Sequence, residues 1–326
     1  MVGGENKDQK KGDALPEGMT EQQMEIMQDE RYKNLDPRMV ELIENEIMER
    51  QLDIGWNDIF RGLRAPPRGV LFFGPPGTGK TLLGKAIAAQ SKSTFMSISA
   101  STLTSKWVGE GEKMVRTMFA IAAIHQPTVI FIDEIDSLLC ARSESDMESS
   151  RRLKTEFLVQ LDGANTFAQE NSRILIIGAT NRPDDLDEAV KRRMAKRMYI
   201  PLPNFAGRKQ FLQRTIEKES KPTDQGGSGH TILLSDEDLN LLVELTKGYS
   251  GADLKSLCAE AAMIPLRSIE DIENVDIDNI RALTLSDFKE ALLNVKATVN
   301  QSELRKFLEW NDMNGSYPIR EEDLQD

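Results

Sequence analysis

Hydrophobic residues follow two different periods along the first two thirds of the chain. Continuous apolar runs of strand length lie at Val70–Phe73, Thr128–Ile132 and Ile174–Ile177, and such runs are typical of strands buried on both faces. Between them, at 112–125 and 148–161, apolar residues recur at helical spacing. Strands that alternate with amphipathic helices predict an α/β fold with a parallel sheet sandwiched by helices.

The pattern changes at Pro201-Leu202-Pro203, after which we expect no further strand. Helical spacing then occupies 205–216, 235–246, 251–269 and 285–294. We therefore predict a large α/β domain over 34–202 and a small all-helical lid domain over 203–299. A last helix around 302–310, followed by an acidic tail, makes up residues 300–326.

The N-terminal part has two patterns. Residues 1–33 are polar and predict a flexible leader or linker. Asp36 is then a suitable N-cap and Pro37 a suitable first helical residue. The apolar residues that follow them in the sequence recur at helical spacing on one face. These positions predict an amphipathic helix that begins at Asp36 and ends near Arg50.

Composition narrows the classes of function. Acidic residues outnumber basic ones by 53 to 41, giving a formal net charge of −12, which argues against direct nucleic-acid binding through bulk charge. Cys140 and Cys258 are too few for a disulfide framework or a zinc site and favour a reducing compartment. We see no signal peptide and no apolar run of membrane length, so we expect no membrane insertion.

The main candidate for chemistry is the glycine-rich stretch Gly74–Thr81, which fits G-x-x-x-x-G-K-[ST] and stands between an apolar strand and an apolar helix. Glycines let main-chain N–H groups turn toward phosphate oxygens, and the positive end of the helix dipole adds to that field. Lys80 is expected to reach the outer phosphates and Thr81 to bind Mg²⁺. The expected nucleotide-binding residues are Gly77, Thr78, Gly79, Lys80, Thr81 and Leu82.

Polar residues follow two of the buried strands. Asp133 is placed to hold Mg²⁺ through its water shell, and Glu134 to polarise an attacking water. The alternative is that both acids cap the helix that follows. Asn181, after the strand at 174–177, could orient that water or sense the outer phosphate, or simply form a turn.

Two further segments allow several interpretations. The basic cluster Lys191–Arg197 is a solvated face, a nucleic-acid patch, or a source of arginine for a neighbouring subunit's triphosphate. Trp107 lies in a glycine-bounded polar loop with no evident core to join, although it could fold onto a neighbouring helix.

Together these residues resemble an AAA ATPase. Within that family the chain resembles the katanin, spastin, fidgetin and Vps4 subgroup, and the resemblance runs from about Leu35 to the end. The motifs that carry this narrower likeness are Leu35-Asp36-Pro37-Arg38, Lys106–Lys113, Glu148–Arg152, Phe157–Gly163 and Pro201-Leu202-Pro203.

The resemblance implies an enzyme that hydrolyses ATP with Mg²⁺ between the subunits of a ring, usually a hexamer, and pulls a polypeptide through its centre. By position, Lys106, Trp107 and Val108 resemble the pore loop that grips substrate. Arg192 and Arg193 match trans-acting arginine fingers. Gly251 and Ala252 match the lid turn beside the nucleotide.

The resemblance offers two substrates, tubulin tails as in microtubule severing and recombinase filaments as in DNA repair. The acidic balance of the chain does not favour acidic tubulin tails. We therefore expect a protein-filament substrate and a location in nucleus and cytoplasm, with the nucleus favoured. A nucleic-acid motor or clamp loader shares the phosphate loop, but the acidic balance and the aromatic pore loop weigh against it.

One departure from the subgroup lies near residues 59–60. Where the subgroup has Ala-Gly and a helix after the segment that resembles Trp56–Ile59, this chain continues directly with Phe60. A helix-length piece that helps to enclose the adenine is thus absent. This motivates an alternative function, a nucleotide-impaired interaction form that modulates rings of full-length partners.

Overall fold

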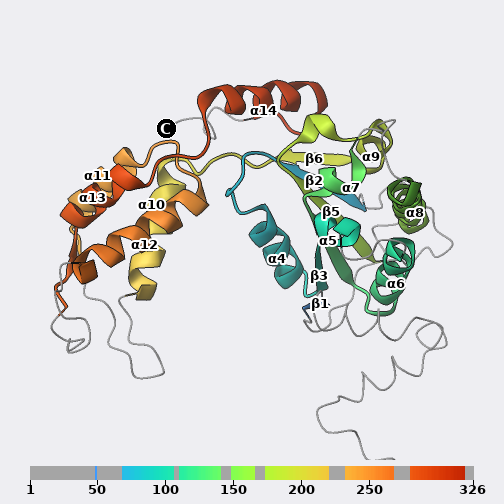
Figure 1. The fold of residues 1–326 in the computed structure, drawn as a ribbon, viewed down its shortest axis with the longest axis horizontal. Coiled ribbons are helices and arrows are strands. Elements are labelled where there is room, and N and C mark those ends of the chain that lie inside the picture. The colour runs from blue at the N-terminus through green and yellow to red at the C-terminus, as the bar shows by residue number, and fades with distance from the viewer. Residues whose placement is uncertain are drawn as a thin grey trace, which may run out of the picture.

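The computed structural model describes residues 48–49, 68–105, 110–140, 148–165, 173–219, 232–267 and 280–319. These residues form an α/β domain and a lid beside it, with a last helix that returns from the lid to the α/β domain (Figure 1). The predicted class, a parallel sheet with helices on both faces followed by a lid, is confirmed.

The sheet has the order β1-β3-β4-β5-β2-β6, and every pair from β3 to β6 is parallel. The three continuous apolar runs form its centre, β4, β5 and β2, where both faces are covered. Toward the two sides, β3 alternates between buried and half-buried residues at its end, and β6 is half-buried throughout. The strands are β1 Met48–Glu49, β2 Gly69–Phe73, β3 Thr94–Ser99, β4 Thr128–Asp133, β5 Ile174–Thr180 and β6 Lys196–Tyr199.

Helices cover the sheet on both faces, with α4 on one side and α6 and α8 on the other (Figure 1). The alternation along the strands divides the core accordingly. Phe72 packs in the cluster on the α4 side, whereas Leu71 and Phe73 pack in the larger cluster on the opposite side. The helices are α4 Lys80–Gln90, α5 Ala100–Ser105, α6 Gly111–Ile124, α7 Ile135–Leu139, α8 Glu148–Asn165 and α9 Glu188–Arg193, with a short 3-10 turn at Pro183–Asp185.

The lid contains the four predicted helices. Ser235 is the N-cap of α11 and forms a capping box in which Asp238 returns the hydrogen bond. The expectation that no strand follows Pro203 is wrong in one detail, because β7 and β8 form a parallel pair of two residues each, too short for any periodicity. The lid elements are α10 Phe205–Glu219, β7 Ile232–Leu233, α11 Asp236–Leu245, α12 Gly251–Arg267, β8 Leu283–Thr284 and α13 Leu285–Asn294.

The helix predicted from Asp36 to Arg50 is wrong at its end. Met48 and Glu49 form β1, which pairs antiparallel with Met96 and Phe95 of β3. A sheet edge offers unpaired N–H and C=O groups, and pairing with them overrides the local helical preference. The rest of that predicted helix, the predicted leader and the junction at 59–60 lie outside the described residues.

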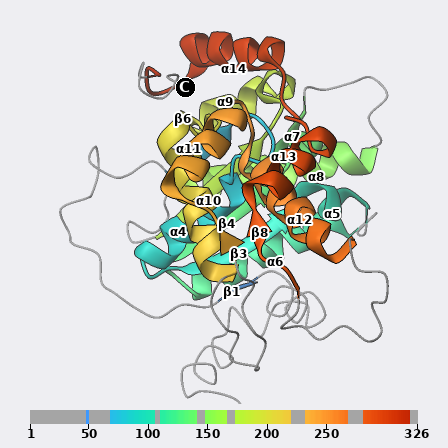
Figure 2. The same cartoon turned by 90° about the vertical axis from the view of Figure 1, so that its left-hand side faces the viewer.

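The last helix, α14 (Gln301–Asn314), packs on the α/β domain beside β6 (Figures 1 and 2). The ring of Trp310 lies edge-on to Phe73 at 4.4 Å between centroids, and Phe307 stacks on Tyr199 at 6.3 Å. Beyond the helix, Ser316 covers the open edge of β6, donating its N–H to the Arg197 carbonyl and accepting the Arg197 N–H. Within the described residues, no helix is both long and apolar enough to cross a bilayer.

Replacing Trp310 by alanine should strongly destabilise the α/β domain, because the side chain is 2% exposed and packs on the residue before the phosphate loop. We expect a loss of about 3–5 kcal/mol in the free energy of unfolding, measured by urea denaturation. Met313 on the same helix is 76% exposed, so Met313→Ala should change the free energy of unfolding by no more than about 0.5 kcal/mol. Equal effects of the two variants would contradict the docking of α14.

Candidate functional site

The glycine-rich stretch forms the turn between β2, which ends at Phe73, and α4, which begins at Lys80. Gly77 and Gly79 have φ of 75° and 84°, the left-handed region that other residues adopt only with strain. The N-terminus of α4 carries no side-chain cap and no acid in its first turn. Its first N–H groups therefore remain available to an anion, which is the fit that a phosphate group requires.

Lys80 is buried beneath this loop, with 7% of its surface exposed. Its Nζ donates to the carbonyls of Gly74 at 3.0 Å and Pro75 at 2.7 Å, which hold the ammonium group at the floor of the turn. Burial lowers the pKa of Lys80 to about 8, and the Asp133 carboxylate partly opposes that shift.

Thr81 and Asp133, the two predicted magnesium ligands, lie together. The Thr81 hydroxyl donates to Asp133 Oδ2 at 2.8 Å, which joins the first turn of α4 to the end of β4. Among the described residues, no group of three or more His, Cys, Asp or Glu side chains is placed to hold a metal. Two oxygen atoms at the base of a phosphate loop nevertheless suit Mg²⁺, which keeps several waters and takes its other ligands from phosphates.

Glu134 follows Asp133 in an unusual backbone conformation, with φ 51° and ψ 43°. Its N–H donates to Asp133 Oδ1 at 3.0 Å, and its side chain is exposed. A non-glycine residue in the left-handed region costs free energy, and such residues cluster at functional sites. Glu134 occupies the N-cap position of α7, but its side chain accepts no capping hydrogen bond. The alternative that this acid serves to cap the helix is therefore not supported for Glu134.

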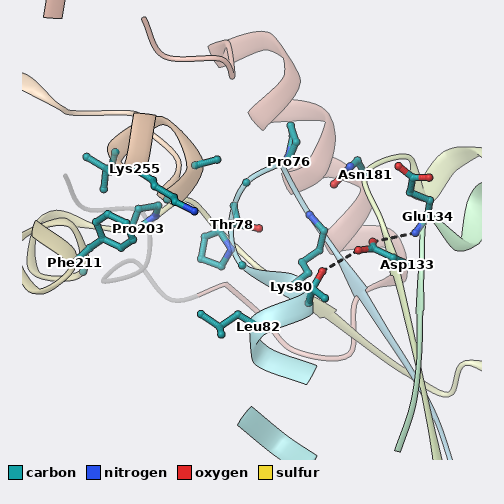
Figure 3. Close-up of a pocket in the computed structure, with 18 residues that line it drawn as sticks. Pro76, Thr78, Lys80, Leu82, Asp133, Glu134, Asn181, Pro203, Phe211 and Lys255 are labelled. Carbon is teal, nitrogen blue, oxygen red and sulfur yellow. Dashed lines mark hydrogen bonds between the residues drawn. The ribbon is translucent and has the colours of Figure 1, made fainter. Parts of the chain in front are cut away.

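A pocket of about 620 Å³ lies between the α/β domain and the lid (Figure 3). It brings together most of the residues that the sequence singles out. From the α/β domain these are Gly77, Thr78, Gly79, Lys80, Thr81, Leu82, Asp133, Glu134 and Asn181, and from the lid Gly251 and Ala252. Asn181 follows the last residue of β5 and is exposed to this space.

The lid contacts the phosphate loop directly. Ala252 at the start of α12 donates its N–H to the Gly77 carbonyl at 3.2 Å. A Cβ atom on Gly77 would lie 2.6 Å from Ser250 Oγ and 2.9 Å from Ala252 Cβ. Glycine at this position is therefore required both for the turn and for the approach of the lid.

The pocket also contains residues to which the sequence had assigned no role at the site: Pro76 within the glycine-rich stretch, Pro201, Pro203, Gly207, Phe211, Leu254 and Lys255. Most of them belong to the linker and lid, whose orientation over the loop cannot be read from local patterns. Lys255 could have been predicted from the sequence. It follows Ala252 by three residues and Gly251 by four, so it lies on the same side of α12 as these two predicted nucleotide-binding residues.

Arg192 and Arg193 do not line this pocket. They end α9, which lies on the side of the sheet away from the lid (Figure 1). Arg193 forms a two-pronged ion pair with Asp162 of α8, at 2.7 Å to Oδ1 and 2.5 Å to Oδ2. Hydrogen bonding in this pair raises the pKa of Arg193 and lowers the pKa of Asp162. Their expected role at a neighbouring copy stays a prediction, and Lys106, Trp107 and Val108 lie outside the described residues.

This fold and this pocket define a phosphate-loop nucleoside triphosphatase with a helical lid. Three family models match the chain: "ATPase family associated with various cellular activities (AAA)" at residues 70–202, "AAA+ lid domain" at 236–290 and "Vps4 C terminal oligomerisation domain" at 267–315. The chain belongs to the AAA family of ATPases, within the group that includes fidgetin-like, spastin and katanin proteins.

Fidgetin-like protein 1 of Rattus norvegicus is 49% identical over 308 residues, which are 87% of this chain and 44% of that protein. The crystal structure of the FIGL-1 AAA domain in complex with ADP is 48% identical, with a TM-score of 0.77 over 87% of this chain and 98% of that one. A structure described as the basis for katanin self-assembly is 34% identical, with a TM-score of 0.65 over 85% and 97%. The chain spans about half the length of the curated relatives it matches.

Nucleotide affinity should fall as pH rises above 8. In the free protein Lys80 loses its proton around pH 8, whereas bound phosphates favour its charged form, so binding above that pH must take up a proton. The dissociation constant for ADP should rise about twofold at pH 8 and about tenfold at pH 9 relative to pH 7, measured by calorimetry.

Lys80→Arg is the matched control for this profile, because arginine keeps its charge throughout the range. Its affinity for ADP should change little between pH 7 and pH 9, whatever its absolute value. A wild-type profile as flat as that of the variant would show that Lys80 does not titrate in this range.

Proposed function

We propose that this ATPase couples hydrolysis to the remodelling or disassembly of a protein assembly, acting as a ring-shaped hexamer. The observation that carries the proposal is the convergence of the phosphate loop, two strand-end acids and the lid on one pocket. A lid that contacts the phosphate loop through Ala252 and Gly77 is suited to convert nucleotide state into movement.

Five polar side chains of the pocket have roles in this proposal, those of Lys80, Thr81, Asp133, Glu134 and Asn181. The loop N–H groups and Lys80 bind the phosphates of ATP, and Thr81 with Asp133 holds Mg²⁺, which neutralises phosphate charge when bound. The exposed carboxylate of Glu134 accepts a proton from water, and the amide of Asn181 orients that water.

Oligomerisation is supported by the match to an oligomerisation-domain model over residues 267–315 and by the likeness to the katanin self-assembly structure. Arg192 is exposed, and none of the described residues forms an ion pair or hydrogen bond with it. It is therefore free to contact the triphosphate of the next copy, while Asp162 holds Arg193 beside it.

The substrate that we propose is a protein filament, with a recombinase filament favoured over tubulin because a chain of net charge −12 gains nothing from acidic tails. With this substrate we also propose a role in DNA repair and a location in nucleus and cytoplasm. A pull-down with a Glu134→Gln variant, which holds ATP without turnover, would identify the bound protein.

Glu134→Gln should abolish hydrolysis and retain nucleotide binding, because it removes the proton acceptor while leaving the loop and Lys80 intact. We expect turnover to fall by about 10³-fold or more with the dissociation constant for ATP changed less than about threefold. Phosphate release and calorimetry measure the two quantities. Glu237→Gln, an exposed change in the lid, should leave both quantities at their wild-type values.

The assay of the wild-type chain also decides between this function and the alternative interaction form. That alternative rests on the junction at 59–60, which lies outside the described residues. Turnover that rises with protein concentration would remove it, and bound nucleotide without turnover at any concentration would favour it.

Mixing two inactive variants should restore activity if the sites lie between subunits. Arg192→Ala keeps Glu134, and Glu134→Gln keeps Arg192, so a site that takes one residue from each chain is complete. Random mixing at equal amounts should recover about a quarter of wild-type turnover, since half the sites keep Glu134 and half of their neighbours keep Arg192. A mixture as inactive as its components would argue against arginine donated in trans.

A further inference from the structure

Arg197, the second residue of β6, connects the ends of two helices that lie far apart in the sequence. Its guanidinium group donates to the carbonyl of Lys191 at 3.0 Å and to that of Met194 at 3.3 Å, at the end of α9. A third hydrogen bond, of 2.8 Å, reaches the carbonyl of Asn314, the last residue of α14. One side chain therefore joins the helix that carries Arg192 to the C-terminal helix.

The chemistry of these contacts suits an arginine. The last four carbonyls of a helix have no partner within the helix, and both Lys191 and Asn314 occupy such positions. The helix dipoles also place partial negative charge at these ends. A planar guanidinium group with five N–H donors serves several acceptors at once, whereas a lysine ammonium group is a compact point charge. Arg197 thus satisfies carbonyls of both helix ends and offsets their charge.

The backbone of Arg197 is tied to the same C-terminal segment. Its N–H donates to Ser316 Oγ at 2.8 Å, and its carbonyl accepts the Ser316 N–H at 2.9 Å. Asn311, which is 4% exposed, holds this segment in turn, because its side-chain amide donates to the Tyr317 carbonyl at 3.1 Å. Residues 314–317, which we call the C-terminal strap, are therefore fixed to β6 by both the main chain and the side chain of Arg197.

Helix α9 depends on contacts of this kind. It has six residues, and helices this short are not stable in isolation. At its start the Asp187 side chain accepts the Ala189 N–H at 2.7 Å, and at its end Arg197 provides the support. The carbonyl of Lys191 belongs to the peptide group that joins Lys191 to Arg192, so the hydrogen bond from Arg197 holds the backbone from which Arg192 projects.

We propose that Arg197 is a positioning residue for hydrolysis, which together with the C-terminal strap holds α9 so that Arg192 reaches the triphosphate of the next copy. This inference rests on the arginine donated in trans under the proposed function. It gives a residue outside the pocket an effect on turnover at the site of another copy, not at the site of its own chain. A displacement of about 1 Å at a catalytic group can cost about 10²-fold in rate.

The test is the turnover and ADP affinity of full-length Arg197→Met, which removes all three guanidinium contacts and keeps most of the side-chain length. We expect turnover at saturating ATP to fall about 10- to 100-fold, because Arg192 is no longer held in place. The dissociation constant for ADP should change by less than about twofold, since Arg197 does not line the pocket. Arg214→Met is the matched control, because Arg214 is an exposed arginine of α10 that does not line the pocket, and it should turn over ATP like wild type.

Mixing two variants decides whether the effect acts in trans. Arg197→Met keeps Glu134, and Glu134→Gln keeps a correctly held Arg192, so equal amounts should recover about a quarter of wild-type turnover. A change that damaged only the site of its own chain would recover nothing, because no chain in the mixture would then combine Glu134 with an intact site.

Arg197→Lys covers the case in which the methionine variant does not fold, which would appear as a loss of ADP binding. It keeps a charge at the two helix ends but cannot reach three carbonyls, so it should lose less turnover and show the same recovery on mixing. Wild-type turnover by either folded Arg197 variant, or a loss that mixing does not recover, would refute the positioning role. An inactive mixture of Arg192→Ala and Glu134→Gln would instead overturn the donation of arginine in trans on which it rests.

Discussion

The contact between the phosphate loop and the first turn of α12 is the constraint on which the site depends. Gly77 has no side chain, and because it lacks a Cβ atom, Ser250 and Ala252 can approach the loop closely. The same glycine has a positive φ. One residue therefore makes the turn of the phosphate loop and also forms the contact surface for the lid. Without that approach Asp133, at the end of β4, and Glu134, directly after it, would face an open surface rather than a pocket completed by the lid.

Much of this arrangement follows from local patterns in the sequence. The apolar runs Val70–Phe73, Thr128–Ile132 and Ile174–Ile177 are continuous, and they form most of the adjacent central strands β2, β4 and β5. Because parallel strands place their carboxyl ends at one edge, the phosphate loop, Asp133 and Asn181 had to meet. The capping box at Ser235 likewise marks the start of α11 through chemistry contained within four residues.

Other features depend on contacts between distant segments and were not predictable in the same way. Nothing near Arg193 in the sequence indicates that Asp162, 31 residues earlier, holds its guanidinium. The left-handed backbone of Glu134 and the burial of Lys80 arise from packing around the loop, not from residue type. Likewise, β1, β7 and β8 have only two residues each, and their pairing exists only once the rest of the fold is present.

The chain passes between the α/β domain and the lid twice, outward at Pro201–Pro203 and back at 295–300. On the outward pass the buried guanidinium of Arg208 donates to the Pro203 carbonyl at 3.0 Å. On the return, Tyr249 donates to the Val295 carbonyl at 2.7 Å, and Thr298 donates its hydroxyl to Asp253 at 3.1 Å. A domain attached through two chain segments rotates most easily about the axis that joins the two attachment points. We therefore expect the lid to move as a rigid body about this single hinge axis.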